Sequence, residues 1–569
     1  MRFRLDPYLG ILLGLAALAL APLTAPGYFM LAHDARHTVY FMQMFDAALR
    51  EGALYPRWAT DMTFGYGYPV WIILAPIPYY MAESFHLAGL DFPAAVKAVE
   101  AVALVASGLT MFLFARRVLG REAGLLAAIA YIFVPYHLVD LYVRGACPEF
   151  LSFVFPPFIL WALYELMTTY RARYVALTAL GYGGLVLTHV QMAVLFSPLI
   201  GGYILLLWLL ESRPKPAGGL HSALGLFAFP ALAALGILWG VALSATFLLP
   251  VLVEQRYITN EPLTGGFFDF HQHFISISQL LSPFWGYGYA GINGGDQFSL
   301  QLGVAPLFLS VLALFGLRRQ GRLARWHLIF FSIVSLAAIL LMLPISGPAW
   351  DLAAPVMAFL QFPWRLLIIT AVGLAFLAGA AVQLVPREDA FAAAMIFSLL
   401  VVAAMFPNAQ PQYTDTAFNY ATLMDFEVKS HELLGDTVWM EPGKRPQDSP
   451  LVAQYLAGAI TEKAVLVEGT GSVKTVEHRF LGDEAQVDAG EPARVMFYTR
   501  YFPGWTATVD GQAVPVQPFG EQGLLAVNVP AGSHIVRTQF GDTWDRQVGA
   551  LVSLVAFAGV MAWLWRKKN

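Results

Sequence analysis

Hydrophobic positions along the chain gather in runs of about 17 to 25 residues, which is the length that a helix needs to cross a membrane. We expect about twelve membrane-spanning helices, near residues 8–26, 93–115, 122–140, 150–168, 173–190, 192–210, 222–249, 299–317, 326–344, 364–385, 389–406 and 547–565. Lysine and arginine residues lie mainly in every second loop between the expected spans. The positive-inside bias therefore predicts that these loops and both termini are cytoplasmic. We interpret the first run as an uncleaved anchor.

The apolar stretch 69–90 is the exception, because we do not expect it to cross the membrane. Three proline residues, Pro69, Pro76 and Pro78, make it a poor straight span and favour an interfacial or re-entrant element. A crossing here would also place Arg116 and Arg117 outside, against the positive-inside bias. The long segments 27–92, 250–298 and 407–546 are therefore predicted to lie together on the outer face.

The pattern changes to short β-type runs near the C-terminus. These runs are 495–498, 505–509, 524–527 and 535–538. Asp510-Gly511 is a strong hairpin signal, and Pro530-Ala531-Gly532 marks another turn. We predict a polytopic α-helical membrane domain over 1–406, an extracytoplasmic domain over 407–546 that is a small antiparallel β-sandwich from about 460, and a final helix with a basic cytoplasmic tail over 547–569.

The composition supports a membrane protein and argues against nucleic-acid binding and cysteine-based sites. Of 569 residues, 58% are hydrophobic and only 13% are charged, so the lipid bilayer is the expected surrounding. The net charge of −4 offers no basic field for nucleic acid. Cys147 is the only cysteine, which excludes an intrachain disulfide and a cysteine-based metal site.

The first outer segment holds the densest set of polar and aromatic residues. Asp34 follows the first apolar run directly, and a carboxylate there can take a proton from an acceptor hydroxyl. The neighbouring candidates for binding a sugar or its phosphate carrier are His33, Arg57, Trp58, Tyr66, Tyr68 and Tyr80. Alternatively, the aromatic residues are interfacial anchors, and Asp34 caps a helix or pairs with Arg36 or Arg57.

Further candidates lie in the other outer segments. Arg144 and Glu149 flank a short outer loop, where they either face a polar cavity or form a structural salt bridge. His189 either contacts substrate or bonds helix to helix. The remaining candidates for binding a phosphosugar are Glu254, Arg256, Trp285 and Arg365. Arg365 either grips a donor phosphate or reaches a lipid phosphate.

Several short motifs follow one another in a familiar order. They are His33-Asp34, Pro56-Arg57-Trp58, Gly65-Tyr66-Gly67-Tyr68-Pro69, Tyr142-Val143-Arg144-Gly145-Ala146 with Glu149, Leu187-Thr188-His189, Phe247-Leu248-Leu249-Pro250 with Glu254, Gln279-Leu280-Leu281-Ser282-Pro283 with Trp285-Gly286-Tyr287-Gly288, Gln361-Phe362-Pro363-Trp364-Arg365 and Phe502-Pro503-Gly504-Trp505. With these motifs the chain resembles the GT-C superfamily of membrane glycosyltransferases, and within it the bacterial YfhO-like branch. The resemblance implies that Asp34 is a catalytic base and that a polyprenyl-phosphate sugar is the donor. It also implies a bacterial inner-membrane location.

The expected reaction is an inverting sugar transfer to an envelope lipid, polymer or protein. Asp34 would deprotonate the acceptor, while Arg57, Arg256 and Arg365 would neutralise the leaving phosphate. The chain has no Asp-x-Asp motif of the kind found in metal-dependent members of the superfamily, so no metal ligands are assigned and a divalent cation stays open as a cofactor. The alternatives are a non-catalytic lipid-carrier or glycolipid transporter, or flippase, and an envelope scaffold subunit.

Overall fold

The computed structural model describes residues 6–29, 31–211, 225–259, 264–414, 418–430, 436–442, 444, 449–458 and 460–565. Within these ranges, nine helices are long and apolar enough to cross a membrane, and a tenth is formed if one bent pair counts as a single span. A β domain follows them near the C-terminus. The prediction of a polytopic helical membrane protein with a C-terminal β-sandwich is therefore confirmed.

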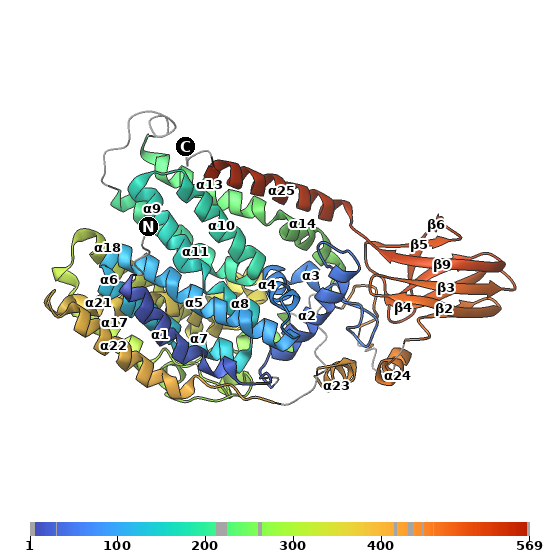
Figure 1. The fold of residues 1–569 in the computed structure, drawn as a ribbon, viewed down its shortest axis with the longest axis horizontal. Helices are drawn as coiled ribbons and strands as arrows, with labels where there is room; N and C mark the ends of the chain where they lie inside the picture. The colour runs from blue at the N-terminus through green and yellow to red at the C-terminus, as the bar shows by residue number, and fades with distance from the viewer. Residues whose placement is uncertain are drawn as a thin grey trace.

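The helices of the membrane domain pack side by side into one bundle, with a shared apolar core (Figure 1). Its longer helices are α1 (Pro7–Leu20), α5 (Phe92–Leu119), α6 (Arg121–Ile132), α9 (Phe155–Thr169), α10 (Arg173–Thr188), α11 (Val190–Leu210), α13 (Ala228–Leu243), α14 (Ala245–Glu254), α17 (Val304–Phe315), α18 (Arg322–Met342), α21 (Leu367–Ala380), α22 (Ala390–Met405) and α25 (Trp544–Trp565). Helix α21 lies at the centre of the bundle, since all its residues are buried.

Four of the twelve expected spans differ from single long helices. The run near 222–249 divides at Ser244 into α13 and α14. The run near 122–140 bends by 43° after α6, because Pro135 disfavours helical geometry at the residue before it. It continues as α7 (Pro135–Val139) and a π-helix, η2 (Asp140–Arg144). The runs near 173–190 and 299–317 form the shorter helices α10 and α17.

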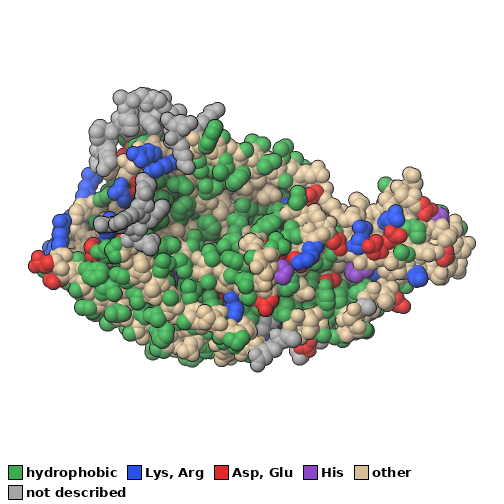
Figure 2. Space-filling model, viewed as in Figure 1, with side chains coloured by type: hydrophobic (Ala, Val, Ile, Leu, Met, Phe, Trp, Pro, Cys, Tyr) green, Lys and Arg blue, Asp and Glu red, His purple; other side chains and the backbone are tan. Residues whose placement is uncertain are grey.

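Some of the basic residues used for the topology prediction fall outside the described residues. These are Arg213, Lys215 and the C-terminal Arg566, Lys567 and Lys568. On the visible face of the molecule, hydrophobic side chains cover most of the helical bundle (Figure 2). Charged side chains gather at the end of the bundle farthest from the β domain and over the β domain itself.

The first outer segment folds into short helices between the bundle and the β domain. They are α2 (Ala35–Arg50), α3 (Val70–Ile73) and α4 (Ile77–Leu87), so no helix spans the whole of 69–90. The helical spacing of apolar positions from Phe41 to Leu49 predicts an amphipathic helix that lies on the membrane surface. Instead, α2 buries Phe41, Met44 and Phe45 against protein side chains of the outer region.

The β domain consists of two antiparallel sheets, with strand orders β1-β4-β8-β7 and β2-β3-β9-β5-β6. The strands are β1 (Ala464–Glu468), β2 (Gly471–Arg479), β3 (Gly482–Ala489), β4 (Ala493–Arg500), β5 (Trp505–Val509), β6 (Gln512–Val514), β7 (Val516–Phe519), β8 (Leu524–Val529) and β9 (Gly532–Phe540). The hairpin expected at Asp510-Gly511 joins β5 to β6, with φ values of 49° and 81° that suit a tight two-residue turn. Helices α23 (Tyr420–Ser430) and α24 (Pro450–Ala457) lie beside this domain (Figure 1).

Candidate active site

A close backbone approach brings the start of α2 against the end of η2. Gly145 has φ +60°, and a Cβ atom there would lie 2.9 Å from the Cβ of Ala35 and 3.1 Å from that of Ala32. The absent side chain allows the amide N–H of Asp34 to donate to the carbonyl of Arg144 at 2.7 Å. Asp34 is consequently fixed beside Arg144 by the backbone itself.

Arg144 is the centre of a buried charge network. Its Nη1 lies 2.8 Å from Oε1 of Glu149 and also donates to Oδ1 of Asp140, four residues earlier. The Tyr136 hydroxyl donates to the same Glu149 oxygen at 2.6 Å. On its outer side, Nη2 of Arg144 lies 3.8 Å from Oδ2 of Asp34. Three carboxylates therefore surround one guanidinium, and Asp34 is the only one of the three with an exposed side chain, at 48%.

Arg365 approaches the same network from a 3-10 helix, η11 (Pro363–Leu366), directly before α21. Its Nε lies 3.5 Å from Oε2 of Glu149. Its Nη1 donates to the carbonyl of Leu360 at 2.9 Å, to Oε1 of Gln361 at 3.0 Å and to Oε1 of Gln191 at 3.4 Å. Glu149 thus joins two arginines, since it contacts Arg144 through one oxygen and Arg365 through the other.

In the described part of the chain, each of the two arginines has one terminal nitrogen that makes no hydrogen bond. Among the described residues, Nη2 of Arg144 and Nη2 of Arg365 donate no hydrogen bond. His189, at the junction of α10 and α11, is partly buried and interacts electrostatically with Glu149, Arg365, Arg144 and Asp34. The site therefore offers uncommitted guanidinium N–H groups beside a half-exposed carboxylate.

His33 links the site to the loop 286–295. Its Nε2 lies 2.8 Å from the carbonyl of Gly288, and its ring stacks on Tyr289 with centroids 4.6 Å apart. The ring also meets the edge of Phe298 at 5.5 Å. Burial lowers the pKa of His33 below its usual 6.5, although Asp34 opposes this. Trp285 lies at the start of the same loop, partly buried, with its indole N–H unpartnered within the described part of the chain.

Arg57 does not contact this cluster. Its Nη2 donates to the carbonyl of Thr246 at 2.8 Å, and its guanidinium lies 3.5 Å from the centroid of Tyr55. Its Nε and Nη1 are buried without a hydrogen-bond partner among the described residues. Tyr80 packs edge-on against Tyr55 and donates to the carbonyl of Leu54 at 2.5 Å. These contacts place Arg57 and Tyr80 near α14, apart from Asp34.

Trp58 belongs to the interface with the β domain. It is fully buried and contacts the rings of Phe502, Trp505 and Phe540 at 5.4 to 6.2 Å. A Cβ at Gly67, where φ is +83°, would lie 2.4 Å from the Trp58 indole nitrogen, so glycine is required for this packing.

Tyr66 and Tyr68 lie at the same interface. The backbone carbonyl of Tyr66 accepts a hydrogen bond from the amide of Arg500 at 2.7 Å, and its ring stacks near Tyr498. Tyr68 is buried and pairs through its backbone with Ala59. The contacts of Tyr66 join the first outer segment to the β domain.

Glu254 and Arg256 also lie away from Asp34. Glu254 forms a buried ion pair with Arg546, at the start of α25, with Oε1 and Nε 3.0 Å apart. Arg256 is exposed and donates to the hydroxyl of Tyr257 at 2.8 Å. Tyr257 in turn stacks on Trp439. Of the thirteen predicted binding residues, the structure gathers His33, Arg144, Glu149, His189 and Arg365 around Asp34.

Three members of the site were not singled out by the sequence. Asp140 and Tyr136 complete the arrangement around Arg144, and Trp364 lies beneath its guanidinium at 5.1 Å. The i, i+4 spacing of Asp140 and Arg144 was a signal that could have found the first of them. Across the described ranges, no three His, Cys, Asp or Glu side chains are grouped to hold a metal ion.

Comparison with known proteins finds structural likenesses at low sequence identity. No family model matches the chain, and no curated protein matches it. The arabinofuranosyltransferase AftD from Mycobacteria is 17% identical with a TM-score of 0.46, over 74% of this chain and 29% of that one. The oligosaccharyltransferase of Archaeoglobus fulgidus is 12% identical with a TM-score of 0.43, over 79% and 60%. ArnT from Cupriavidus metallidurans, bound to undecaprenyl phosphate, is 13% identical with a TM-score of 0.39, over 70% and 63%.

The chain thus spans less than a third of the length of AftD and under two thirds of the other two proteins. Two of these proteins, AftD and the oligosaccharyltransferase, are transferases by name, and all three TM-scores are below 0.5.

Proposed function

We propose that this chain is an inverting membrane glycosyltransferase of the GT-C type, which moves a sugar from a polyprenyl-phosphate donor to an extracytoplasmic acceptor. The observation that carries the proposal is the half-exposed Asp34 carboxylate, held 3.8 Å from a buried arginine that keeps donors free. A base and an anion-binding group side by side are what displacement of a phosphate by a hydroxyl requires.

In this mechanism Asp34 accepts the proton of the acceptor hydroxyl as its oxygen attacks the anomeric carbon. The bond from that carbon to the phosphate oxygen breaks, and the configuration at the carbon inverts. The uncommitted Nη2 groups of Arg144 and Arg365 bind the leaving polyprenyl phosphate. No separate acid is needed, because the phosphate departs as a stable anion.

Glu149 and Asp140 act as positioning residues in this proposal. Both are buried, at 1% and 0% exposure, and they hold Arg144 through its Nη1 so that Nη2 faces Asp34. Their negative charges also offset the cost of burying two arginines when no phosphate is bound. Arg57 and Arg256 take no part in the step, since their contacts lie elsewhere.

The test is transfer from radiolabelled polyprenyl-phosphate sugars in membranes that contain the chain, with and without a chelator. Formation of a labelled product of inverted anomeric configuration supports the proposal, and loss of product with chelator would add a metal to it. Labelled carrier that is bound or moved across the bilayer without transfer would instead establish a transporter. Absence of transfer, of carrier binding and of carrier movement would favour a scaffold subunit.

A further inference from the structure

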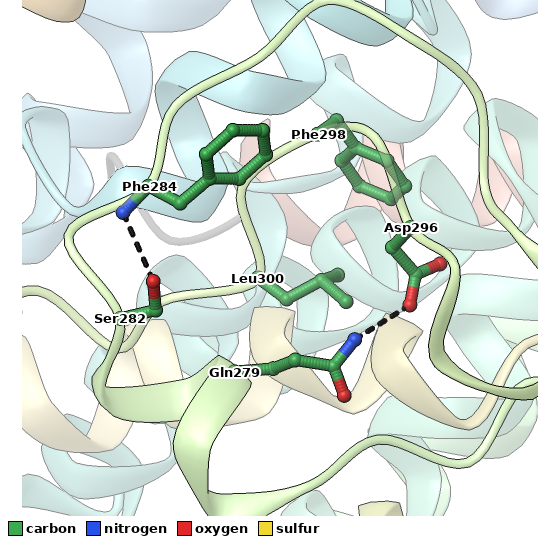
Figure 3. Close-up of a pocket in the computed structure, with 6 residues that line it drawn as sticks. All are labelled: Gln279, Ser282, Phe284, Asp296, Phe298 and Leu300. Atoms are coloured by element: carbon green, nitrogen blue, oxygen red, sulfur yellow. Dashed lines mark hydrogen bonds between the residues drawn. The ribbon is translucent and has the colours of Figure 1, made fainter.

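A small cavity is lined by residues between 279 and 300, beside the candidate active site. Its volume is about 120 Å³. Its lining residues are Gln279, Ser282, Phe284, Asp296, Phe298 and Leu300 (Figure 3). The volume is about four times the ~30 Å³ that one water molecule occupies in the liquid, so part of one sugar ring fits within it.

The lining has an apolar side and a polar side. Phe284, Phe298 and Leu300 form the apolar side, while the side chains of Gln279 and Asp296 meet on the polar side (Figure 3). Nε2 of Gln279 donates to Oδ2 of Asp296 at 2.8 Å. The amide of Gly291 donates to the other carboxylate oxygen at 3.1 Å. The polar groups are thus fixed before any ligand arrives.

These fixed groups keep hydrogen-bonding capacity for a ligand. Each Asp296 oxygen accepts one bond and retains a second lone pair, and Gln279 uses one of its two N–H groups on Asp296. The Ser282 hydroxyl oxygen accepts from the Phe284 amide at 3.2 Å, which leaves its own hydrogen free to donate. Together they offer acceptors and donors for adjacent hydroxyl groups.

The negative charge of the cavity lining favours a neutral ligand over a phosphate. The cavity is lined by one carboxylate and no lysine or arginine. A phosphate would be repelled by Asp296, whereas a sugar ring offers hydroxyls for the polar side and an apolar face for Phe284. Phe284 is 51% exposed, so it offers part of its ring to a ligand from solution.

Phe298 connects the lining of the cavity to residues around Asp34. Phe298 lines the cavity and contacts the ring of His33 at 5.5 Å and that of Trp364 at 5.2 Å. Trp364 lies under Arg144, which approaches Asp34. A glycan seated in the cavity would therefore extend toward the carboxylate past the loop that His33 contacts.

We propose that this cavity is a subsite for a neutral sugar unit of the acceptor, so that the acceptor is itself a glycan. This inference rests on the proposed function for its role in transfer, but the binding of a neutral sugar stands independently of it. Arg144 and Arg365 would take the charged donor, and the cavity would take the uncharged acceptor.

The experiment measures saturation-transfer NMR signals from the methyl glycosides of glucose, mannose, galactose and arabinofuranose, with the full chain in lipid nanodiscs. At least one glycoside is expected to give a signal that falls at least fivefold in Phe284→Ala and in Asp296→Asn. The matched controls are Phe315→Ala, an exposed ring elsewhere, and Asp351→Asn, an exposed carboxylate outside the lining, and both should keep the signal.

Asp34→Asn should also keep the signal, which separates this inference from the proposed function. Sugar binding that is lost in Phe284→Ala, in a chain that shows no transfer, would support the subsite and reject the transferase. Absence of signal from every glycoside, or an unchanged signal in both cavity variants, would overturn the subsite even if transfer is observed. Because Phe284 is half-exposed, its replacement tests the cavity without opening the core.

Discussion

The ion pair between Glu254 and Arg546 allows a quantitative test of how the β domain is held on the membrane helices. The side chains are 1% and 0% exposed, and Arg546 also donates to the carbonyls of Gly541 and Pro503. Glu254→Gln keeps the shape but removes the charge, so a buried guanidinium is left with uncharged acceptors. Breaking a buried pair by changing one partner costs about 3–5 kcal/mol.

Because the glutamine oxygen still accepts one hydrogen bond, we expect a loss near the lower end, about 3 kcal/mol. At about 1.36 kcal/mol for each factor of ten, this loss opens the junction about a hundredfold more often. Hydrogen exchange of the peptide that contains Gly541 measures it, because that amide donates to the carbonyl of Gly504 at 2.9 Å.

Glu521→Gln is the matched control for this measurement. Glu521 pairs with Lys444 at 2.9 Å, but both side chains are exposed, at 59% and 47%. Exposed pairs contribute about 0–1 kcal/mol, so exchange at Gly541 should stay within a few-fold of the native rate. Equal exchange in the native chain and Glu254→Gln would refute the reasoning, as would an equally large effect of Glu521→Gln.

Three further predictions concern the site and the outer segments. Gly145→Ala should abolish transfer and destabilise the fold by about 1–3 kcal/mol through overpacking. Gly52 also has a positive φ, but a Cβ atom there would meet no neighbour. In a thermal unfolding assay, Gly52→Ala should therefore show only the cost of placing alanine at a positive φ. Burial raises the pKa of Glu427 from 4.5 to about 7, so the free energy of unfolding should fall by about 3 kcal/mol as pH rises from 4.5 through 7. In Glu427→Gln, the midpoint of unfolding should depend less on pH over this range. The pKa of His33 is lowered in the folded protein, so the contribution of this side chain to folding stability should decline as pH falls below 6.5. His33→Gln retains a donor for the carbonyl of Gly288 and should lack this decline. A decline in stability of equal size in both proteins would contradict the assignment.

The membrane helices could be predicted because hydrophobic length is a local property of the sequence. Long helices such as α5 and α21 fall close to the expected ranges. The run near 299–317 became shorter because residues 299–303 are not helical, and the amide of Leu302 instead donates to the carbonyl of Leu280. That contact joins residues distant from the expected helix, so hydropathy alone gave no sign of it.

The site residues divide in the same way. The sequence indicated Asp34, Arg144, Glu149 and Arg365, which the structure brings together, because charged residues near the ends of apolar runs are costly and therefore informative. Trp58 has the same chemistry as a sugar-stacking residue, yet it packs against the β domain. Pairings between distant segments decide which polar and aromatic residues face substrate, and these pairings follow from the three-dimensional fold.

The central claim is that Asp34 is the base of a glycosyl transfer. The most direct measurement compares two aspartates that occupy helix N-cap positions. Asp34 and Asp389 both precede a helix without a side-chain capping bond, at φ −110° and −95°. The rate of sugar transfer should fall about 10²–10⁴-fold in Asp34→Asn, the usual contribution of a general base. Asp389→Asn should transfer at the native rate. Equal rates in Asp34→Asn and the native chain would contradict the account.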